Sequence, residues 1–535
     1  MATDVGWDFG RVEVPATATE CPNMPSLMAE LAKYAPGGPL DGQAGEIAMT
    51  GGDVYGRFGI DFWSFTNKLK VYGRQDGTTQ VRGTVGGGNG LDRGHAFRME
   101  GVRNVEIYNI DFNAEGQLHT SNGVQSATIL GAHWAGDTTR ADVFNIHMQG
   151  CRFRNSRQAG IKVDGDGGTD GVTLQQCTAM NTGLQWTAGD SEGFGEGIYC
   201  GDGNSKRAWS NITFDRCHVF NVYMGEGIEM KLNGTNGLVK DCWIHDVLID
   251  NGGGLKFTDN DTYQAIGNSI WNIGSTPDSD TEGYGIFTTG GGTFLNNTVW
   301  NCERATVGFS RSLDSGRTSV FNHNTFAADN GSWTDIEGKT YGNADAAFYF
   351  TGNFGNSSRT HDQLVTSQND CIVGSRNVGS YSGASWTNDQ SGSFVGPTSG
   401  DADGGEGPGS GFVLSGGNAR NAVGALVVAH DARGYIRVAP TDAGAYDADG
   451  IPPSPPPPFV FTSPTNGQTG FQVGANLVGT CTPGDQVEVL IETDVASPVT
   501  VVDWSAAVVV GSDFTFDPPS NLSPSTAYRA RLRRP

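Results

Sequence analysis

The chain has 535 residues, 80 of them glycine, and this length allows two to four domains or one long repetitive domain. Its formal charge of −24 disfavours binding to nucleic acid or to free polyanionic glycans, unless bound cations or a basic patch intervene. No apolar run approaches the ~18 residues of a membrane span, the glycines lack the period of collagen, and the nine cysteines form no Cys-x-x-Cys pair.

Residues 1–24 are expected to form an arm ahead of the main domain. The first part of this arm, residues 1–14, is polar and mixed and lacks the basic and apolar regions of a secretory signal peptide. We expect either a leader that was removed or release without one, as for virion proteins freed by lysis. The start at Met1 favours a native N-terminus.

A short repeat occupies the middle of the chain. Its pattern is Cys or Asn, an apolar residue two positions later, and Asn or Asp after two more. The clear copies begin at Cys151, Cys177, Cys217, Cys242, Asn268 and Asn297, with looser copies at Ile110 and Asn324. From Cys151 onward the steps are 25–29 residues, apart from one step of 40 that indicates an insertion. A repeat of this length indicates a solenoid.

A second pattern, glycine followed by an alternating strand, comes after most copies of the first. It begins at Gly160, Gly197, Gly227, Gly254 and Gly285. Two or three brief strands per period cannot close a core alone, but coils stacked about 4.8 Å apart can.

With these repeats, residues 25–448 resemble the right-handed parallel β-helix proteins of the pectate-lyase-like group, so the expected fold class is all-β. Two flanking features add to the resemblance. An amphipathic helix, suited to capping the first coil, is predicted from the spacing of Met24, Leu27, Met28 and Leu31. The segments His430–Arg437 and Asp442–Tyr446 look like the closing segment of many bacterial and phage β-helices.

The C-terminal part is predicted to be a separate module. Residues 449–458, which contain a polyproline run, read as a semi-rigid linker. Residues 459–535 read as a small β-sandwich of immunoglobulin or fibronectin-III type. The strands predicted in it are Phe459–Thr462, Leu477–Cys481, Val487–Thr493, Thr500–Trp504, Phe514–Phe516 and Ala527–Leu532.

The repeated polar residues are predicted to be structural. Cys151, Cys177, Cys217 and Cys242 are expected to stack inside as buried thiols rather than to bind metal or form disulfides. The Asn or Asp that closes each copy is expected to form a ladder at a turn. Its members are Asn155, Asn181, Asn221, Asp246, Asn272 and Asn301.

Chemistry is therefore expected on outward positions of the second strand. Alternation places Lys162, Tyr199, Glu229, Lys256 and Phe287 in one outward column. The next outward column is predicted to contain Asp164, Gly201, Lys231, Thr258 and Thr289. A patch of Tyr199, Glu229, Lys231 and Lys256 could support β-elimination, in which a base removes the proton next to a uronate carboxylate. The alternative is a solvated column of surface ion pairs.

The segment Glu226–Asn236 is similar to the strand of alginate- and chondroitin-type β-helix lyases that carries a calcium-linked Glu and a catalytic Lys. The resemblance implies these roles for Glu226 and Lys231. The family's arginine falls at Thr258 in this chain, and Lys256 lies two residues away.

Three further groups of residues, namely tryptophans, acidic loops and histidines, are candidates for ligand sites. Trp243, Trp271 and Trp300 are predicted to form an exposed carbohydrate-binding platform, or else to be covered by a loop or a neighbouring subunit. Acidic loops could hold Ca²⁺, although none has EF-hand spacing. They contain Asp164, Asp166 and Asp170, then Asp259 and Asp261, and then Asp278, Asp280 and Glu282. His218, His245 and His323 are interpreted as ordinary histidines, and no metal site or other cofactor is predicted from them.

Two functions from different classes remain open. The favoured one is a virion-associated spike or fibre that engages cell-surface carbohydrate, with or without depolymerase activity. Its partners would be a glycan and other virion proteins, and the shape of such spikes in the family implies a homotrimer. The alternative is a secreted polysaccharide lyase with Lys231 as base; a bacterial surface adhesin differs from the first only in its route to the surface.

Overall fold

The computed structural model describes residues 10–327 apart from short gaps, and beyond them a set of strands and Arg437. The gaps are 52–53, 56–57, 62–63, 84–94, 115–125, 132–142, 164–168, 185–194, 202–208, 232–233, 249–252, 259, 261, 275–282, 290, 304 and 313–318. Contacts between residues divide the chain into two units, residues 1–451 and 452–535.

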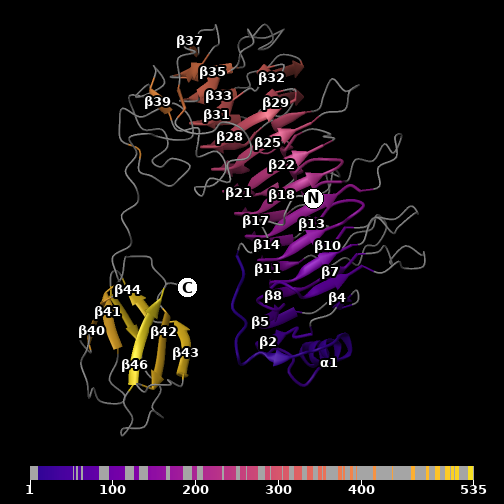
Figure 1. Ribbon diagram of the computed structural model, residues 1–535, viewed down its shortest axis with the longest axis vertical. Helices are drawn as coiled ribbons and strands as arrows, with labels where there is room; N and C mark the ends of the chain where they lie inside the picture. Colours follow the sequence, from indigo (N-terminus) through magenta and orange to yellow (C-terminus); the bar gives the residue numbers. More distant parts are fainter. Residues whose placement is uncertain are drawn as a thin grey trace. The chain divides into compact units, whose positions relative to one another are not determined.

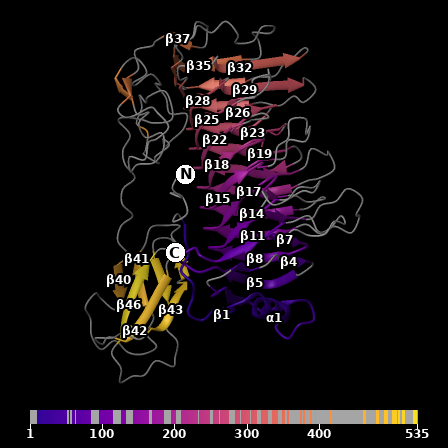
Figure 2. The same cartoon turned by 45° about the vertical axis from the view of Figure 1, so that its right-hand side comes forward.

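Three long parallel sheets, here named A, B and C, make up the first unit (Figures 1 and 2). Sheet A contains β1 (Thr19–Glu20), β2 (Gly45–Ala48), β5 (Ser64–Tyr72), β8 (Arg103–Tyr108), β11 (Phe144–Gln149), β14 (Thr169–Gln175), β17 (Trp209–Asp215), β20 (Gly234–Thr235), β21 (Leu238–Lys240), β24 (Gln264–Ile266), β27 (Thr293–Leu295), β30 (Ser319–Asn322), β33 (Phe348–Thr351) and β35 (Ile372–Ser375). Sheet B contains β3 (Val54–Tyr55), β6 (Gln80–Arg82), β9 (Asp111–Asn113), β12 (Arg152–Arg154), β15 (Thr178–Thr182), β18 (His218–Val222), β22 (Trp243–Val247), β25 (Ser269–Ile273), β28 (Thr298–Cys302), β31 (Thr325–Ala327), β34 (Phe354–Asn356), β36 (Asn377–Gly379) and β37 (Trp386–Asn388). Sheet C contains β4 (Phe58–Asp61), β7 (Phe97–Glu100), β10 (Thr128–Leu130), β13 (Ile161–Val163), β16 (Ile198–Cys200), β19 (Ile228–Met230), β23 (Leu255–Phe257), β26 (Tyr284–Thr288), β29 (Ala305–Ser312) and β32 (Thr334–Tyr341).

Each coil runs from sheet A through sheet B to sheet C and then enters the next coil, so this unit is a right-handed parallel β-helix, as predicted. Equivalent residues of successive coils pair in register. For example, His218, which follows Cys217, pairs with Trp243, which follows Cys242 in the next coil. The long step of the repeat arises largely between β15 and β16. The chain between these two strands is longer than the chain between the equivalent strands of the following coil, β18 and β19.

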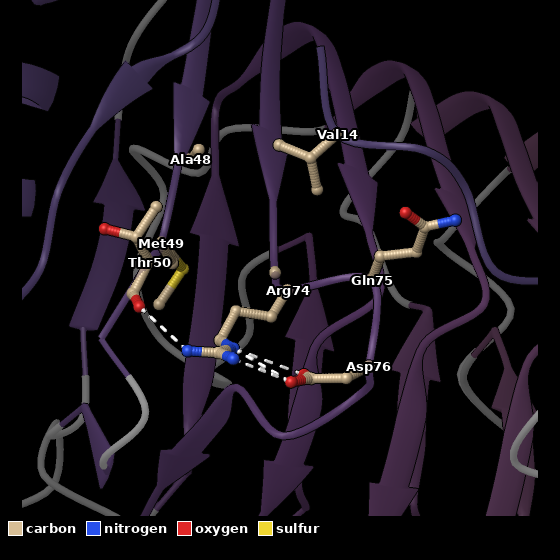
Figure 3. Close-up of a pocket in the computed structure, with 8 residues that line it drawn as sticks. Val14, Ala48, Met49, Thr50, Arg74, Gln75 and Asp76 are labelled. Atoms are coloured by element: carbon tan, nitrogen blue, oxygen red, sulfur yellow. Dashed lines mark hydrogen bonds and ion pairs between the residues drawn. The ribbon is translucent and has the colours of Figure 1, made fainter. Parts of the chain in front are cut away.

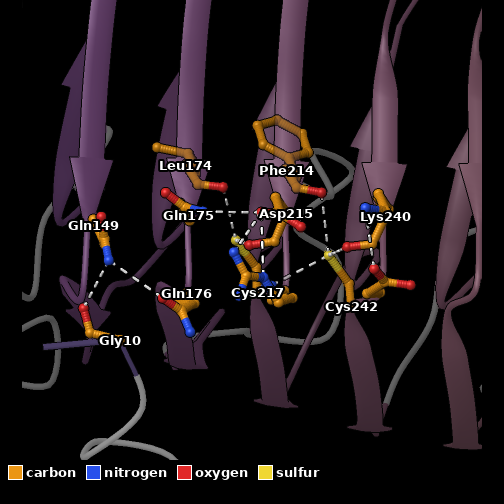
Figure 4. Close-up of polar contacts among 12 residues, drawn as sticks. Gly10, Gln149, Leu174, Gln175, Gln176, Phe214, Asp215, Cys217, Lys240 and Cys242 are labelled. Carbon is orange, nitrogen blue, oxygen red and sulfur yellow. Dashed lines mark hydrogen bonds and ion pairs between the residues drawn. The ribbon is translucent and has the colours of Figure 1, made fainter. Parts of the chain in front are cut away.

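The predicted cysteine column is confirmed. Cys151, Cys177, Cys217 and Cys242 are free and buried in the interior. Figure 4 shows the Sγ atoms of Cys217 and Cys242 donating to the carbonyl oxygens of Leu174 and Phe214, each at 3.4 Å. In the next three coils, the buried Asn268, Asn297 and Asn324 continue the column, with side-chain amides bonded to each other at 2.9 Å.

The ladder that closes each copy of the repeat is confirmed too. Its six residues all adopt the left-handed conformation, with φ between 49° and 55°, which Asn and Asp tolerate better than other side chains. Asn181, for instance, donates to Asn155 at 3.2 Å, and Asn272 donates to Asp246 at 2.9 Å. The ladder therefore provides hydrogen-bond partners for side-chain amides of neighbouring coils, and its left-handed backbone bends the chain near the end of the sheet B strands.

The N-terminal cap helix forms as α1 (Met24–Tyr34), next to β2 at one end of the stack (Figure 1). Asn23 caps it in a capping box with Ser26, and Leu27 and Leu31 are buried in the common core. Met28 is exposed, which corrects its predicted place on the buried face. Within the described residues, α1 is the only helix, and none could cross a membrane.

The arm before this helix lies along the solenoid. Val12 exchanges two hydrogen bonds with the side chain of Asn109, and Gln149 donates to the carbonyl oxygen of Gly10 at 3.2 Å. Of the two predicted closing segments, only Arg437 is described. Its buried guanidinium donates to Asn296 Oδ1 at 3.0 Å, while the rest lies outside the described residues.

The second unit contains two antiparallel sheets, and its proline-rich start lies outside the described residues. One sheet has β40 (Val460–Ser463), β41 (Leu477–Thr480), β45 (Asp513–Phe516) and β44 (Val508–Val510), and the other has β43 (Thr500–Ala506), β42 (Glu488–Thr493) and β46 (Tyr528–Arg533). All six predicted strands are present, within a few residues, and β44 was missed. An immunoglobulin-type topology stays a prediction. A two-stranded antiparallel pair, β38 (Ser393–Phe394) with β39 (Leu414–Gly416), belongs to the first unit.

Candidate functional site

The outer face of sheet C carries the predicted column of polar and aromatic residues. Lys162, Tyr199, Glu229, Lys256 and Phe287 pair in register on β13, β16, β19, β23 and β26. Three residues earlier in the chain, a parallel column holds Glu196 and Glu226, since Ile198 pairs with Ile228. Two residues later, Lys231 and Thr258 follow Met230 and Phe257, which also pair. The site is therefore a patch three columns wide on neighbouring coils.

Three buried carboxylates meet in this patch. Glu196, Glu226 and Glu229 are 1%, 1% and 0% exposed, and one carboxylate oxygen from each lies within 4.8 Å of the others. Among the described residues, neither oxygen of Glu196 has a hydrogen-bond partner. Burying a charged carboxylate without a partner costs free energy of folding. Glu196 is therefore suited to bind a ligand or to carry a proton.

Two lysines compensate the other two carboxylates. Lys256 Nζ lies 2.5 Å from Glu226 Oε1 and 3.0 Å from Glu229 Oε1, and Lys231 Nζ lies 2.6 Å from Glu229 Oε1. The Lys231 side chain is 22% exposed and has one carboxylate partner, whereas that of Lys256 is 15% exposed and has two. Lys231 is therefore the freer amine.

The surroundings shift the protonation of these groups strongly. Burial, followed by the charge of Glu229, raises the pKa of Glu226 to about 7 against the pull of Lys256. Burial and the charges of Glu226 and Glu229 raise the pKa of Glu196 well above its usual range. Burial by itself lowers the pKa of Lys256, but the Glu226 and Glu229 carboxylates outweigh it and raise that pKa. The cluster thus favours the charged form of Lys256, and it favours the protonated form of Glu196 more than an exposed position would.

The tyrosine and threonine of the patch border the two lysines. The Tyr199 ring lies 5.2 Å from Lys162 Nζ and 5.7 Å from Lys231 Nζ, in cation–π range. Thr258, where the lyase family has arginine, follows the neighbouring strand in register with Lys231. Its buried hydroxyl has no hydrogen-bond partner within the described part of the chain. Tyr199 and the Thr258 hydroxyl are buried, so both contribute to the surroundings of the lysines rather than to an open surface.

The carboxylates fit a hard divalent cation such as Ca²⁺. Three carboxylates face two ammonium groups, so the fully ionised cluster keeps one uncompensated negative charge. Ca²⁺ takes oxygen ligands, and Glu196 offers two that are otherwise unused. Glu196, Glu226 and Glu229 would hold such an ion.

Sequence reasoning missed Glu196. It brought Tyr199, Glu226, Glu229, Lys231 and Lys256 into one patch, and the structure places these five residues together. A signal was available, because Glu-Gly-Ile begins two successive strands of sheet C, at Glu196 and at Glu226. Gly197 and Gly227 were already aligned as starts of the same pattern, but the residue before Gly197 was not compared with Glu226.

The predicted tryptophan platform is wrong. Trp271 and Trp300 stack at 4.9 Å, but they are 5% and 1% exposed, so their faces are not available to a sugar. Trp243 belongs to another column, because it pairs with His218 and Ser269 rather than with the two stacked indoles. The two indoles are instead covered on the outer face of sheet B, which was the alternative to an exposed platform.

Of the acidic loop residues, only Asp170 is described, and it accepts hydrogen bonds from Ser210 Oγ and Asn211 Nδ2. The other predicted Ca²⁺ ligands lie outside the described residues. His218 and His245, interpreted from the sequence as ordinary histidines, contact each other, with their Nε2 atoms 2.7 Å apart. Burial, and then the neighbouring His245, lowers the pKa of His218 to about 3.

A pocket of about 300 Å³ lies near the first coils, away from sheet C (Figure 3). Val14 of the arm, the end of β2 and the residues that follow β2 and β5 line it, with Arg74 and Asp76 as its charged residues. These two pair with each other at 2.8 Å, so the pocket offers no uncompensated group for catalysis.

No family model matches the chain, and no curated protein matches it. Among solved structures, pectate lyase Pel9A is 13% identical, with 71% of this chain and 88% of the lyase covered and a TM-score of 0.43. The periplasmic alginate epimerase AlgG is 10% identical, with 56% and 78% covered and a TM-score of 0.34. The tailspike gp49 from Acinetobacter baumannii bacteriophage Fri1, a capsular polysaccharide depolymerase, is 12% identical, with 94% and 81% covered and a TM-score of 0.22.

The chain shares the parallel β-helix fold. At these identities and TM-scores the comparisons carry no argument about its site, and the fold assignment stands on the strand pairing described above.

Proposed function

We propose that this protein engages an acidic polysaccharide on the outer face of sheet C and cleaves it by β-elimination. The observation that carries the proposal is the buried group of Glu196, Glu226 and Glu229 beside Lys231 and Lys256. A solvated column of surface ion pairs would not bury three carboxylates to 1% exposure or less.

In the proposed reaction Lys231 is the base. The neutral amine of Lys231, formed when its ammonium releases a proton to solvent, takes the proton from the carbon next to the uronate carboxylate, and the electrons of the broken C–H bond form a C4=C5 double bond. The C4–O glycosidic bond breaks, and the departing oxygen takes a proton from water. Lys231 suits this role better than Lys256, because it is the more exposed amine and has one carboxylate partner instead of two.

Lys256 and the carboxylates would stabilise the charge that develops on the substrate. Removal of the proton places negative charge on the uronate carboxylate, and fixed cations placed there in advance lower the barrier. Lys256 is such a cation. A divalent ion on the three carboxylates would supply a second positive charge to the uronate. It would also explain how a chain of charge −24 can bind a polyanion.

The experiment is to incubate the full chain with alginate, polygalacturonate and chondroitin, with and without CaCl₂, and to follow the ultraviolet absorbance of unsaturated uronates. We expect absorbance to rise with at least one substrate and the rise to stop when a chelator is added. Products with saturated ends only would indicate hydrolysis, and no cleavage of any uronate polymer would contradict the proposal.

Lys231→Met tests the base, and Lys240→Met is its matched control. Lys240 lies on sheet A, is largely exposed and pairs with Asp241 at 3.5 Å. We expect Lys231→Met to lower kcat about 10²–10⁴-fold, and Lys240→Met to leave kcat unchanged. Lys231→Met also removes the ion pair with the buried Glu229, so kcat is compared at a temperature where circular dichroism shows both variants to be folded. Full activity of Lys231→Met would remove Lys231 from the mechanism.

Location and assembly remain proposals from the sequence. We propose that the chain is a virion spike or fibre that meets cell-surface carbohydrate, with secretion as the alternative. Capsid and tail genes beside its gene would favour the virion, whereas sugar-uptake genes would favour a secreted enzyme. Light scattering on the purified chain tests the homotrimer.

A further inference from the structure

Two histidines from successive coils meet on the outer face of sheet B, away from the carboxylate site. His218 lies on β18, and His245 lies on β22, in the adjacent outward column. Their Nε2 atoms are 2.7 Å apart, so a single proton lies between the two rings. The Nδ1 atom of His218 is buried and has no hydrogen-bond partner among the described residues.

Aspartate replaces asparagine at the ladder position next to this pair. Five of the six ladder residues are Asn, whereas Asp246 stands directly after His245. Its Oδ2 accepts a hydrogen bond from His245 Nδ1 at 2.9 Å, while Oδ1 accepts the ladder bond from Asn272 at 2.9 Å. The carboxylate therefore retains the structural role of the amide and also sets the tautomer of His245, leaving the Nε2 lone pair directed at His218.

Aromatic contacts hold both rings in this orientation. Trp271 stacks on His245 at 4.2 Å between centroids. Phe220 lies 4.5 Å from His218 and 5.4 Å from His245, and Trp243 meets His218 edge-on at 5.4 Å. The His245 side chain is 15% exposed, so the pair can be reached from solvent.

We propose that His218 and His245 form a binding site for a divalent transition-metal ion, which both Nε2 atoms ligate while Asp246 orients His245 from behind. Imidazole suits Cu²⁺, Ni²⁺ and Zn²⁺, and a carboxylate on the far nitrogen of a ligating histidine is typical of such sites. Two nitrogen ligands at right angles, each ~2.0–2.1 Å from the ion, lie about 2.9 Å apart. The present separation of 2.7 Å needs only a small opening of the rings to admit the ion. The tetragonal preference of Cu²⁺ and Ni²⁺ fits this spacing best, and solvent completes the coordination.

Such an ion would clip two successive coils together. The unfolded chain does not bring His218 and His245 into contact, so binding favours the folded state and raises the unfolding temperature. This site is independent of the carboxylate cluster on sheet C, and failure of one proposal leaves the other intact.

The test is to titrate the full chain with CuCl₂ and record the paramagnetic resonance spectrum, together with thermal unfolding in NiCl₂. We expect nitrogen hyperfine structure from two imidazoles, one bound ion per chain at this site, and a rise in the unfolding temperature. Absence of two-nitrogen coupling in the wild-type chain would overturn the proposal, whatever the variants do.

Variants distinguish metal binding at this histidine pair from metal binding by other residues of the chain. His245→Gln should abolish the two-nitrogen signal, and Asp246→Asn, which matches the other ladder residues, should weaken affinity about 10–100-fold. His147→Gln on sheet A is the matched control for a half-buried histidine, and Glu196→Gln is the control for the carboxylates; both should bind as the wild type does. Unchanged binding in His245→Gln, with its fold verified by circular dichroism, would also overturn the proposal.

Discussion

Glu196 and Glu226 occupy the same position of two successive coils, each directly before a Gly-Ile pair whose isoleucines, Ile198 and Ile228, lie in register. The two carboxylates are almost fully buried, and oxygen atoms of both lie within 4.8 Å of Glu229 and of each other. Close carboxylates cannot all be ionised without a compensating cation. Lysines supply part of this compensation, and the rest comes from a proton or a metal ion.

Glu196→Gln keeps the shape of the side chain and removes its capacity for charge. We expect the unfolding temperature without divalent ions to stay the same or to rise, because no ion pair to Glu196 is lost. In the wild type, Ca²⁺ at one hundred times its Kd should add about 2.7 kcal/mol to the free energy of unfolding, and Glu196→Gln should lose this gain. Glu46→Gln on β2 is the control; a full calcium effect in Glu196→Gln would exclude Glu196 as a ligand.

Glu226 makes stability depend on pH. The folded state raises its pKa from the usual 4.5 to about 7, so between these values the folded chain holds a proton that the unfolded chain has released. Without divalent ions, the contribution of Glu226 to the free energy of unfolding should be complete below pH 4.5 and should be lost as the pH rises through about 7. Urea unfolding of the wild type and of Glu226→Gln measures this, and their difference should change within this window and be flat on either side.

Lys256→Met leaves Glu226 without its lysine and Glu229 with Lys231 alone. Removing one partner of a buried ion pair typically costs about 3–5 kcal/mol, and we expect a loss of this size in the free energy of unfolding. CaCl₂ should restore part of it, because the ion takes over the compensation. A loss below about 1 kcal/mol, which is typical of surface ion pairs, would show that the cluster is effectively solvated.

Gly227 separates the two columns of the site and has no room for a side chain. A Cβ atom there would lie 2.3 Å from Ile244 Cγ2 and 2.5 Å from the carbonyl oxygen of Gly254. Overpacking costs ~1–3 kcal/mol, and the backbone contact adds to it. Gly227→Ala should therefore lower the unfolding midpoint and displace Glu226 and Glu229, so activity should fall even where the chain remains folded.

Trp271→Ala tests whether the Trp271 indole is a buried packing residue or an exposed platform for a sugar. The indole is buried between His245 and Trp300. Its removal should cost about 3–5 kcal/mol, as for other buried aromatic residues. If Trp271 were instead an exposed sugar platform, the variant would be nearly as stable as the wild type and would lose only affinity for the glycan.

The repeat in the sequence was sufficient to predict the solenoid and its columns. Coils stack in register, so a spacing of 25–29 residues already tells which side chains become neighbours. For this reason the cysteine column, the ladder and the order Lys162, Tyr199, Glu229, Lys256 were predicted correctly. Alternation along each short strand then separated inward from outward positions.

Only the tertiary structure decided which outward positions are buried and which side chains reach each other diagonally. Alternation assigns Trp271 and Trp300 to an outer face, but whether that face meets water depends on what packs over it, which no local pattern encodes. Glu196 lies three residues before Tyr199, across Gly197, so alternation does not place it on the face of that column. The contact between His218 and His245 likewise joins adjacent columns of adjacent coils, and it depends on side-chain rotamers and on the Asp246 carboxylate. Register along a solenoid is a property of spacing, whereas burial and the reach of a side chain are properties of the folded whole.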